Sequence, residues 1–115
     1  MKRDMDLIRS ILLEVEKSLS PDGCRIEIPG RGREELYYNA QLAHEAGFID
    51  ARFLRGSTEF HIFRLTYEGH EFLDAARNDT LWNKAKEIVL KNTGTLTLEG
   101  MKIALSTVVR HALGA

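Results

Sequence analysis

Apolar side chains recur at every third or fourth position in the first part of the chain, which is the spacing of one face of an α-helix. The pattern predicts a helix over residues 4–19, capped by Asp4 and ended by the turn-forming run Ser20-Pro21-Asp22-Gly23. The apolar stripe of this helix consists of Met5, Ile8, Leu12, Val15 and Leu19.

The pattern then changes to strict alternation over residues 24–28. Cys24, Ile26 and Ile28 alternate with charged residues, which is typical of a short, half-buried strand. The following residues 29–32 are rich in glycine and contain a proline, so they predict a turn. They lack the spacing of a phosphate-binding loop.

Helical spacing returns over residues 33–46, where Leu36, Ala40 and Ala43 form a narrow apolar stripe. Gly47 is placed to end this central helix in a left-handed conformation. The opposite face is either a plain solvated surface or a recognition face that uses tyrosine, glutamine and arginine. That face carries Arg33, Tyr37, Tyr38, Gln41, His44 and Glu45.

A β-hairpin is predicted next, with strands over residues 48–54 and 59–65 and a turn over residues 55–58. Arg52 and Arg55 lie at or near its tip. In a DNA-binding wing, arginines at this place contact phosphates or the minor groove. Arginine at an exposed tip also serves solubility alone, so both interpretations stay open.

The second strand has apolar residues on both of its faces. Alternation predicts that Phe63 and Leu65 point to the core. Phe60 and Ile62 then lie on the opposite face, where they are candidates for a partner surface or for cover by the C-terminal helices.

The C-terminal part reads as helical. Thr66 is suited to cap a helix that starts at residue 67. The run Asn78-Asp79-Thr80 leaves open whether residues 67–91 form one kinked helix or two. A last helix is predicted over residues 98–113.

The last helix is apolar beyond a single face, so it must bury much of its surface against its own domain or a second copy. Leu105 and Val109 are the candidate interface residues. Trp82, at helical spacing among apolar neighbours, is predicted to be a core residue.

These elements predict an α+β, mostly α fold: a winged helix-turn-helix-like core of helix, short strand, helix and β-hairpin wing, followed by C-terminal helices. We expect residues 1–115 to form a single domain. The winged-helix core covers 1–66, with its wing hairpin at 48–65, and the helical extension covers 67–115. A standard helix-turn-helix has a separate helix before the recognition helix, whereas residues 20–32 are predicted here to form a turn, a strand and a turn. Either that helix has been lost, or one turn of it lies near Pro29 to Arg33.

Composition limits the possible functions. The chain has 16 Lys and Arg against 17 Asp and Glu and a formal net charge of −1, so any nucleic-acid site must be a local patch. One cysteine excludes an internal disulfide and fits a reducing cytosol. The charged N-terminus and the short apolar runs predict no signal peptide and no membrane span, hence a cytoplasmic protein.

No pattern of catalytic or metal-ligating residues is present in the sequence. The four histidines fall on different predicted elements, and the single cysteine rules out a CxxC motif. No nucleophile motif and no carboxylate pair stands out. We therefore expect no enzymatic activity, no metal and no cofactor.

Two phrases resemble known families. The run Ala46-Gly47-Phe48-Ile49, followed after the hairpin by Leu65-Thr66-x-x-Gly69, is similar to the "AGLI … LTxxG" phrase of many bacterial winged-helix regulators. The phrase indicates a fold more than a function.

A closer resemblance covers nearly the whole chain. Residues 1–9, 65–74 and 79–86 together resemble a small bacterial and phage family that is catalogued as a domain of unknown function, number 2513. The resemblance implies the fold and a bacterial or prophage origin. It implies no activity, cofactor or catalytic residue.

Two hypotheses of function follow. The first is a small DNA-binding regulator that contacts double-stranded DNA, although Glu34 and Glu35 stand where phosphates would come. The second is a protein-interaction or dimerisation module, bound to itself through the C-terminal helices or to another protein. In the first, Tyr37, Tyr38, Gln41 and His44 would enter the major groove, and Arg31, Arg33, Arg52 and Arg55 would hold phosphates.

Overall fold

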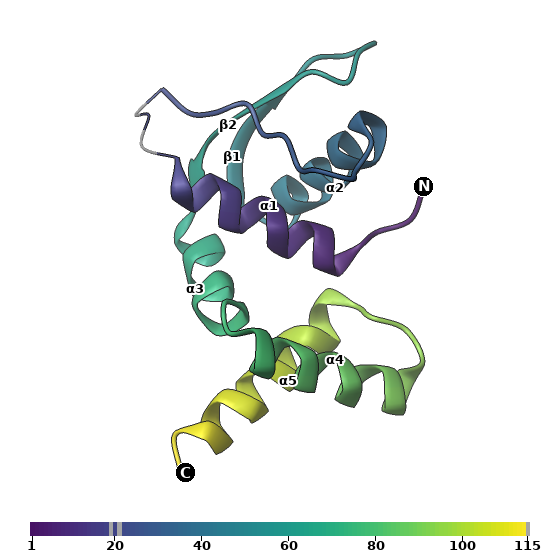
Figure 1. The fold of residues 1–115 in the computed structure, drawn as a ribbon, viewed down its shortest axis with the longest axis vertical. Helices are drawn as coiled ribbons and strands as arrows, with labels where there is room; N and C mark the ends of the chain where they lie inside the picture. The colour runs from purple at the N-terminus through teal and green to yellow at the C-terminus, as the bar shows by residue number, and fades with distance from the viewer. Residues whose placement is uncertain (19, 21, 115) are drawn as a thin grey trace. The chain divides into compact units, whose positions relative to one another are not determined.

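The computed structural model describes residues 1–18, 20 and 22–114. The chain forms two compact units, Met1–Glu71 and Phe72–Ala115. The first unit holds two helices, a β-hairpin and the start of a third helix (Figure 1). The second unit holds the end of that helix and two more.

Helix α1 (Met5–Lys17) starts where the sequence predicts. Asp4 caps it, because the Leu7 N–H donates to Asp4 Oδ1 over 3.0 Å. Met5, Ile8, Leu12 and Val15 of its predicted apolar stripe are buried, and the neighbouring Ile11 is fully buried with Leu12. Leu19 and Pro21, predicted to belong to this helix and to the turn after it, lie outside the described residues.

The strand predicted over residues 24–28 is wrong in extent. The segment contributes a single antiparallel bridge between Cys24 and Ile62. Its alternation is nevertheless real, since Ile26 is buried while Arg25 and Glu27 are exposed. The segment therefore lies along strand β2 without forming a ladder with it, as Figure 1 shows.

Helix α2 (Arg33–Glu45) buries Leu36, Ala40 and Ala43, as predicted. It ends at Gly47, whose φ of 82° is the left-handed conformation expected there. Asn39 is also buried, which the sequence did not indicate. Its Oδ1 accepts from the Asp4 N–H (2.8 Å) and its Nδ2 donates to the Glu35 carbonyl (3.0 Å), so it joins α2 to the start of α1.

Strands β1 (Ile49–Phe53) and β2 (Phe60–Leu65) form an antiparallel hairpin. Asp50 pairs with Arg64, but the next residue, Ala51, pairs with Ile62. Phe63 is therefore the extra residue of a β-bulge.

The bulge reverses the predicted faces of β2, because one extra residue shifts the alternation. Phe60 and Ile62 are buried together with Leu65, whereas Phe63 is 44% exposed. The predicted core position of Phe63 and the predicted outward face of Phe60 and Ile62 are both wrong.

Helix α3 (Tyr67–Ala76) begins beside the backbone that follows α2. Thr66 caps it, with the Gly69 N–H donating to Thr66 Oγ1 (3.0 Å). The Thr66 N–H donates to the Phe48 carbonyl (2.9 Å), and its hydroxyl donates to the Gly47 carbonyl. These bonds join the two halves of the phrase that resembles winged-helix regulators.

In the second unit, α3 ends before a separate helix, α4 (Asp79–Thr93), which Asn78 caps. The open question of one helix or two is thus resolved as two. Helix α5 (Leu98–Ala112) starts at the predicted cap Thr97 and packs on α4. Trp82 is buried, as predicted, with its ring 6.2 Å from that of Phe72.

The layout agrees with the predicted α+β, mostly helical fold. The described part of residues 18–32 contains no helix, so the second helix of a standard helix-turn-helix is absent from that part. None of the helices in the described residues is both long enough and apolar enough to span a bilayer.

Candidate interaction surfaces

Three of the predicted DNA-contacting residues on α2 fasten the hairpin to the helix. Arg33 donates to the carbonyls of Ile26 and Thr58, both over 2.9 Å. The Tyr37 hydroxyl donates to the Leu54 carbonyl over 3.0 Å. His44 Nδ1 lies 3.0 Å from the Ile49 carbonyl oxygen, at the start of β1. Their polar groups are therefore engaged in hydrogen bonds within the unit.

Ring contacts reinforce the same attachment. The Arg33 guanidinium lies 4.8 Å from the centre of the Phe60 ring, in cation–π geometry. The Tyr37 ring packs edge-on against Phe53 at 5.5 Å. The hairpin is thus held to α2 by aromatic packing as well as by hydrogen bonds.

Arg31 is neutralised by acids of the same unit. Its Nη1 lies 2.8 Å from Asp4 Oδ2 and 3.4 Å from Glu35 Oε1. The hydrogen bond that Arg31 donates to the Asp4 carboxylate raises the pKa of the Arg31 guanidinium above its ordinary value, and the charges of Asp4 and Glu35 add to this. Two further arginines also form ion pairs with acids of this unit: Arg25 with Glu59 (3.0 Å) and Arg64 with Asp50 (2.7 Å).

Arg52 and Arg55, by contrast, are exposed and form no hydrogen bond or ion pair with any residue the structure describes. Both belong to the hairpin. Tyr38 and Gln41 are half-buried on α2, and they too have no polar or ring contact within the described residues. Of the eight predicted DNA contacts, these four remain available to a ligand.

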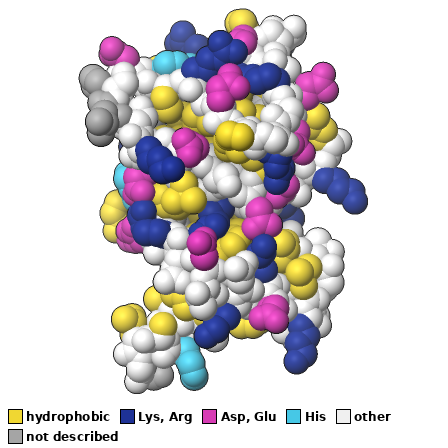
Figure 2. All heavy atoms as spheres, in the orientation of Figure 1, with side chains coloured by type: hydrophobic (Ala, Val, Ile, Leu, Met, Phe, Trp, Pro, Cys, Tyr) yellow, Lys and Arg dark blue, Asp and Glu magenta, His cyan; other side chains and the backbone are white. Residues whose placement is uncertain are grey.

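The charge of the first unit opposes an extended phosphate-binding surface. Residues 1–71 carry ten Lys and Arg against thirteen Asp and Glu, a formal charge of −3. Glu34 and Glu45 stand exposed at the two ends of α2. Figure 2 shows basic and acidic side chains intermingled on the face it displays, without a field of one sign.

Three of the four predicted interface residues are buried and offer no surface. Phe60 and Ile62 lie inside because the bulge turns their face of β2 toward the core. Leu105 lies on the buried stripe of α5, while Val109 is half-buried at the edge of that stripe.

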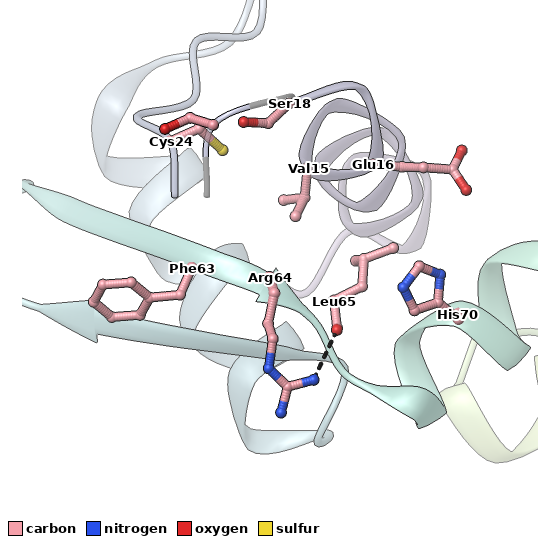
Figure 3. A pocket seen from close by; sticks show the side chains of 9 residues that line it. Val15, Glu16, Ser18, Cys24, Phe63, Arg64, Leu65 and His70 are labelled. Carbon is pink, nitrogen blue, oxygen red and sulfur yellow. Dashed lines mark hydrogen bonds between the residues drawn. The ribbon is translucent and has the colours of Figure 1, made fainter. Parts of the chain in front are cut away.

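A different surface surrounds Phe63. A hollow of about 410 Å³ lies between α1, β2 and the first turns of α3 (Figure 3). Its apolar lining comes from Val15, Cys24, Phe63 and Leu65. The polar side chains that line it are Glu16, Ser18, Ser20, Arg64 and His70.

The Phe63 ring is held in place at this hollow. The ring of His61 contacts it edge-on at 5.0 Å, and His61 Nε2 lies 2.6 Å from the Asp22 carbonyl oxygen. Cys24, which the alternation places on the apolar side of a half-buried strand, is half-buried and carries a free thiol here.

Phe63 was not predicted to be a surface residue, although the sequence contains a signal for it. Four large apolar residues stand among the six of β2, and strict alternation cannot bury all four on one face. Such a strand either exposes apolar residues or contains a bulge. Among the residues described, no group of three His, Cys, Asp or Glu could hold a metal ion.

Comparison with known proteins agrees with the resemblance noted in the sequence. The profile of the family described as "Hypothetical protein (DUF2513)" matches residues 2–95. A relative from Haemophilus influenzae Rd, named "Uncharacterized protein", is 37% identical over 121 residues, which cover 98% of this chain and 99% of the relative. No solved structure matches the chain.

Proposed function

We propose that this chain, which belongs to the DUF2513 family, is a non-catalytic protein-binding module built on a winged-helix-like frame. The observation that carries the proposal is Phe63, which the β-bulge turns out of the core onto the rim of a hollow. Bulges commonly re-aim a side chain, and exposed aromatic residues are the usual anchors of protein interfaces.

The composition of the hollow supports a protein partner. Apolar walls formed by Val15 and Leu65 are bordered by an acid, Glu16, and by Arg64 and His70. Apolar centres with mixed polar rims are typical of protein interfaces, whereas phosphate sites are dominated by cations. The space suits one or two side chains of a partner.

Phe63 alone would contribute substantially to the free energy of binding a partner. A phenylalanine buries on the order of 200 Å² when fully covered, so covering the part of Phe63 that is now exposed would contribute about 2 kcal/mol. Because His61 already orients the ring, little further side-chain freedom is lost on binding.

The test compares two exposed hairpin residues. Phe63→Ser removes the proposed anchor, and Leu54→Ser changes a residue that is 60% exposed and does not line the hollow. We expect tagged wild-type protein and the Leu54 variant to capture the same partner from the cells that encode the protein. The amount of this partner captured by the Phe63 variant should be at least about tenfold lower. Equal capture by all three proteins, or by none, would count against the proposal.

A second candidate, DNA binding by the hairpin, is favoured by Arg52 and Arg55, which have no ion-pair partner among the described residues. Two phosphate contacts would give a slope of log affinity against log salt of about −1.8. Fluorescence anisotropy with mixed-sequence duplexes at low salt measures this slope. The hypothesis requires that slope in the wild type and its loss in the double variant Arg52→Glu, Arg55→Glu.

A further inference from the structure

The second unit has a groove of its own along helix α4. A hollow of about 410 Å³ is lined by Lys84, Glu87, Ile88 and Lys91 of α4 and by Val108 of α5. The four α4 residues follow the spacing i, i+3, i+4, i+7, so they form one face of the helix. The hollow therefore lies beside about two turns of α4, and we call it the α4–α5 groove.

The floor of this groove is apolar and partly uncovered. Ile88 is 39% exposed at its centre, and Val108 closes it from α5. Lys91 follows Lys84 by two helical turns, which places them about 10 Å apart along the helix axis on either side of Ile88. A groove of this kind is what an amphipathic helix fills with its apolar face.

The charges around the groove indicate the sign of the charge that a partner must carry. Neither Lys84 nor Lys91 forms an ion pair with a residue that the structure describes. Glu87 is the only acid among the described residues that line the groove, so the net charge of this lining is positive. The unit as a whole carries six Lys and Arg against four Asp and Glu, a formal charge of +2.

We propose that this α4–α5 groove binds an acidic amphipathic helix of a partner protein. The apolar side of that helix covers Ile88, and its carboxylates meet Lys84 and Lys91. A second copy of the chain fits less well. A two-fold antiparallel pairing of α4 about Ile88 brings Lys84 of one copy close to Lys91 of the other, and like charges at close range repel.

Designed peptides test the proposal without knowledge of the natural partner. One peptide is a helix of about four turns with leucine on one face and glutamate on the rest. A matched peptide carries lysine in place of every glutamate. Fluorescence anisotropy with the full-length protein is expected to show the acidic peptide binding at least about tenfold more tightly than the basic one.

Variants on the groove make the result specific. The double variant Lys84→Glu, Lys91→Glu should reverse the order of the two peptides. Ile88→Gln should weaken the acidic peptide about tenfold or more. Leu90→Gln is the matched control, because Leu90 is 47% exposed on α4 but does not line the groove, and it should leave binding unchanged.

Circular dichroism melts check that each variant is folded. The proposal is overturned if neither peptide binds, if both bind equally, or if Leu90→Gln weakens binding as much as Ile88→Gln. It is also overturned if analytical ultracentrifugation shows a dimer that Ile88→Gln dissociates, because the groove is then occupied by a second copy. These outcomes are independent of the Phe63 hollow, which lies on the other unit.

Discussion

A β-carbon on Gly69 would lie 2.1 Å from the carbonyl oxygen of Phe48. The first turn of α3 thus approaches the backbone after α2 so closely that only glycine fits. The same Phe48 carbonyl accepts a hydrogen bond from the Thr66 N–H. The close approach of Gly69 and the position of the capping residue Thr66 therefore both depend on where the Phe48 carbonyl lies. This explains physically why Gly47-Phe48 and Thr66-x-x-Gly69 occur together.

Gly69→Ala should therefore lower the free energy of unfolding by about 2–3 kcal/mol, because the backbone has to move to admit the methyl group. Urea unfolding followed by circular dichroism measures the loss. Gly32→Ala is the control, since apart from its own chain neighbours no described atom lies within 4 Å of the place its methyl group would occupy, and its φ is an ordinary −73°. A loss of the same size in both variants would refute the close-approach explanation.

Replacing Arg33 by methionine should lower the stability of the protein much more than replacing Arg52 by methionine. Arg33→Met loses two hydrogen bonds from a charged group to the carbonyls of Ile26 and Thr58, which should cost about 2 kcal/mol of stability. Arg52→Met should change stability by less than about 0.5 kcal/mol, because its side chain is exposed and has no partner in the described structure. Equal effects in chemical unfolding would contradict the structural role given to Arg33.

The two phenylalanines of β2 offer a direct check of the bulge. Phe60→Ala should destabilise the protein by about 3 kcal/mol, because it leaves a cavity beside the rings of Tyr37 and Phe53. Phe63→Ala should cost clearly less, about 1–2 kcal/mol, since Phe63 is already 44% exposed and its removal leaves no closed cavity. If thermal or urea unfolding shows a larger loss of stability for Phe63→Ala than for Phe60→Ala, the bulge is contradicted and the regular register that simple alternation predicts is supported.

Local features of this fold could be predicted from the sequence, and distant ones could not. The caps at Asp4 and Thr66 and the stop at Gly47 depend on residues within one helical turn, and the structure has all three. The bulge at Phe63 depends on how β1 and β2 meet across the hairpin, which a single strand does not reveal.

The candidate site was harder to predict for the same reason. Arg31 looked available for phosphate, but its partner Asp4 stands 27 positions earlier in the chain. Arg25 is likewise paired with Glu59, 34 positions away. A charge count along the sequence shows nearly equal numbers of acids and bases, yet it does not show which arginines are already paired.

Crosslinking from position 63 tests most directly whether this winged-helix-like frame binds a protein through the hollow at Phe63. The photoreactive analogue benzoylphenylalanine would replace Phe63 in one variant and Leu54 in another, and both would be irradiated in the cells that encode the protein. We predict that position 63 forms an adduct with one defined protein, identified by mass spectrometry, and that position 54 does not. Adducts with DNA, or the same proteins crosslinked from both positions, would contradict the account.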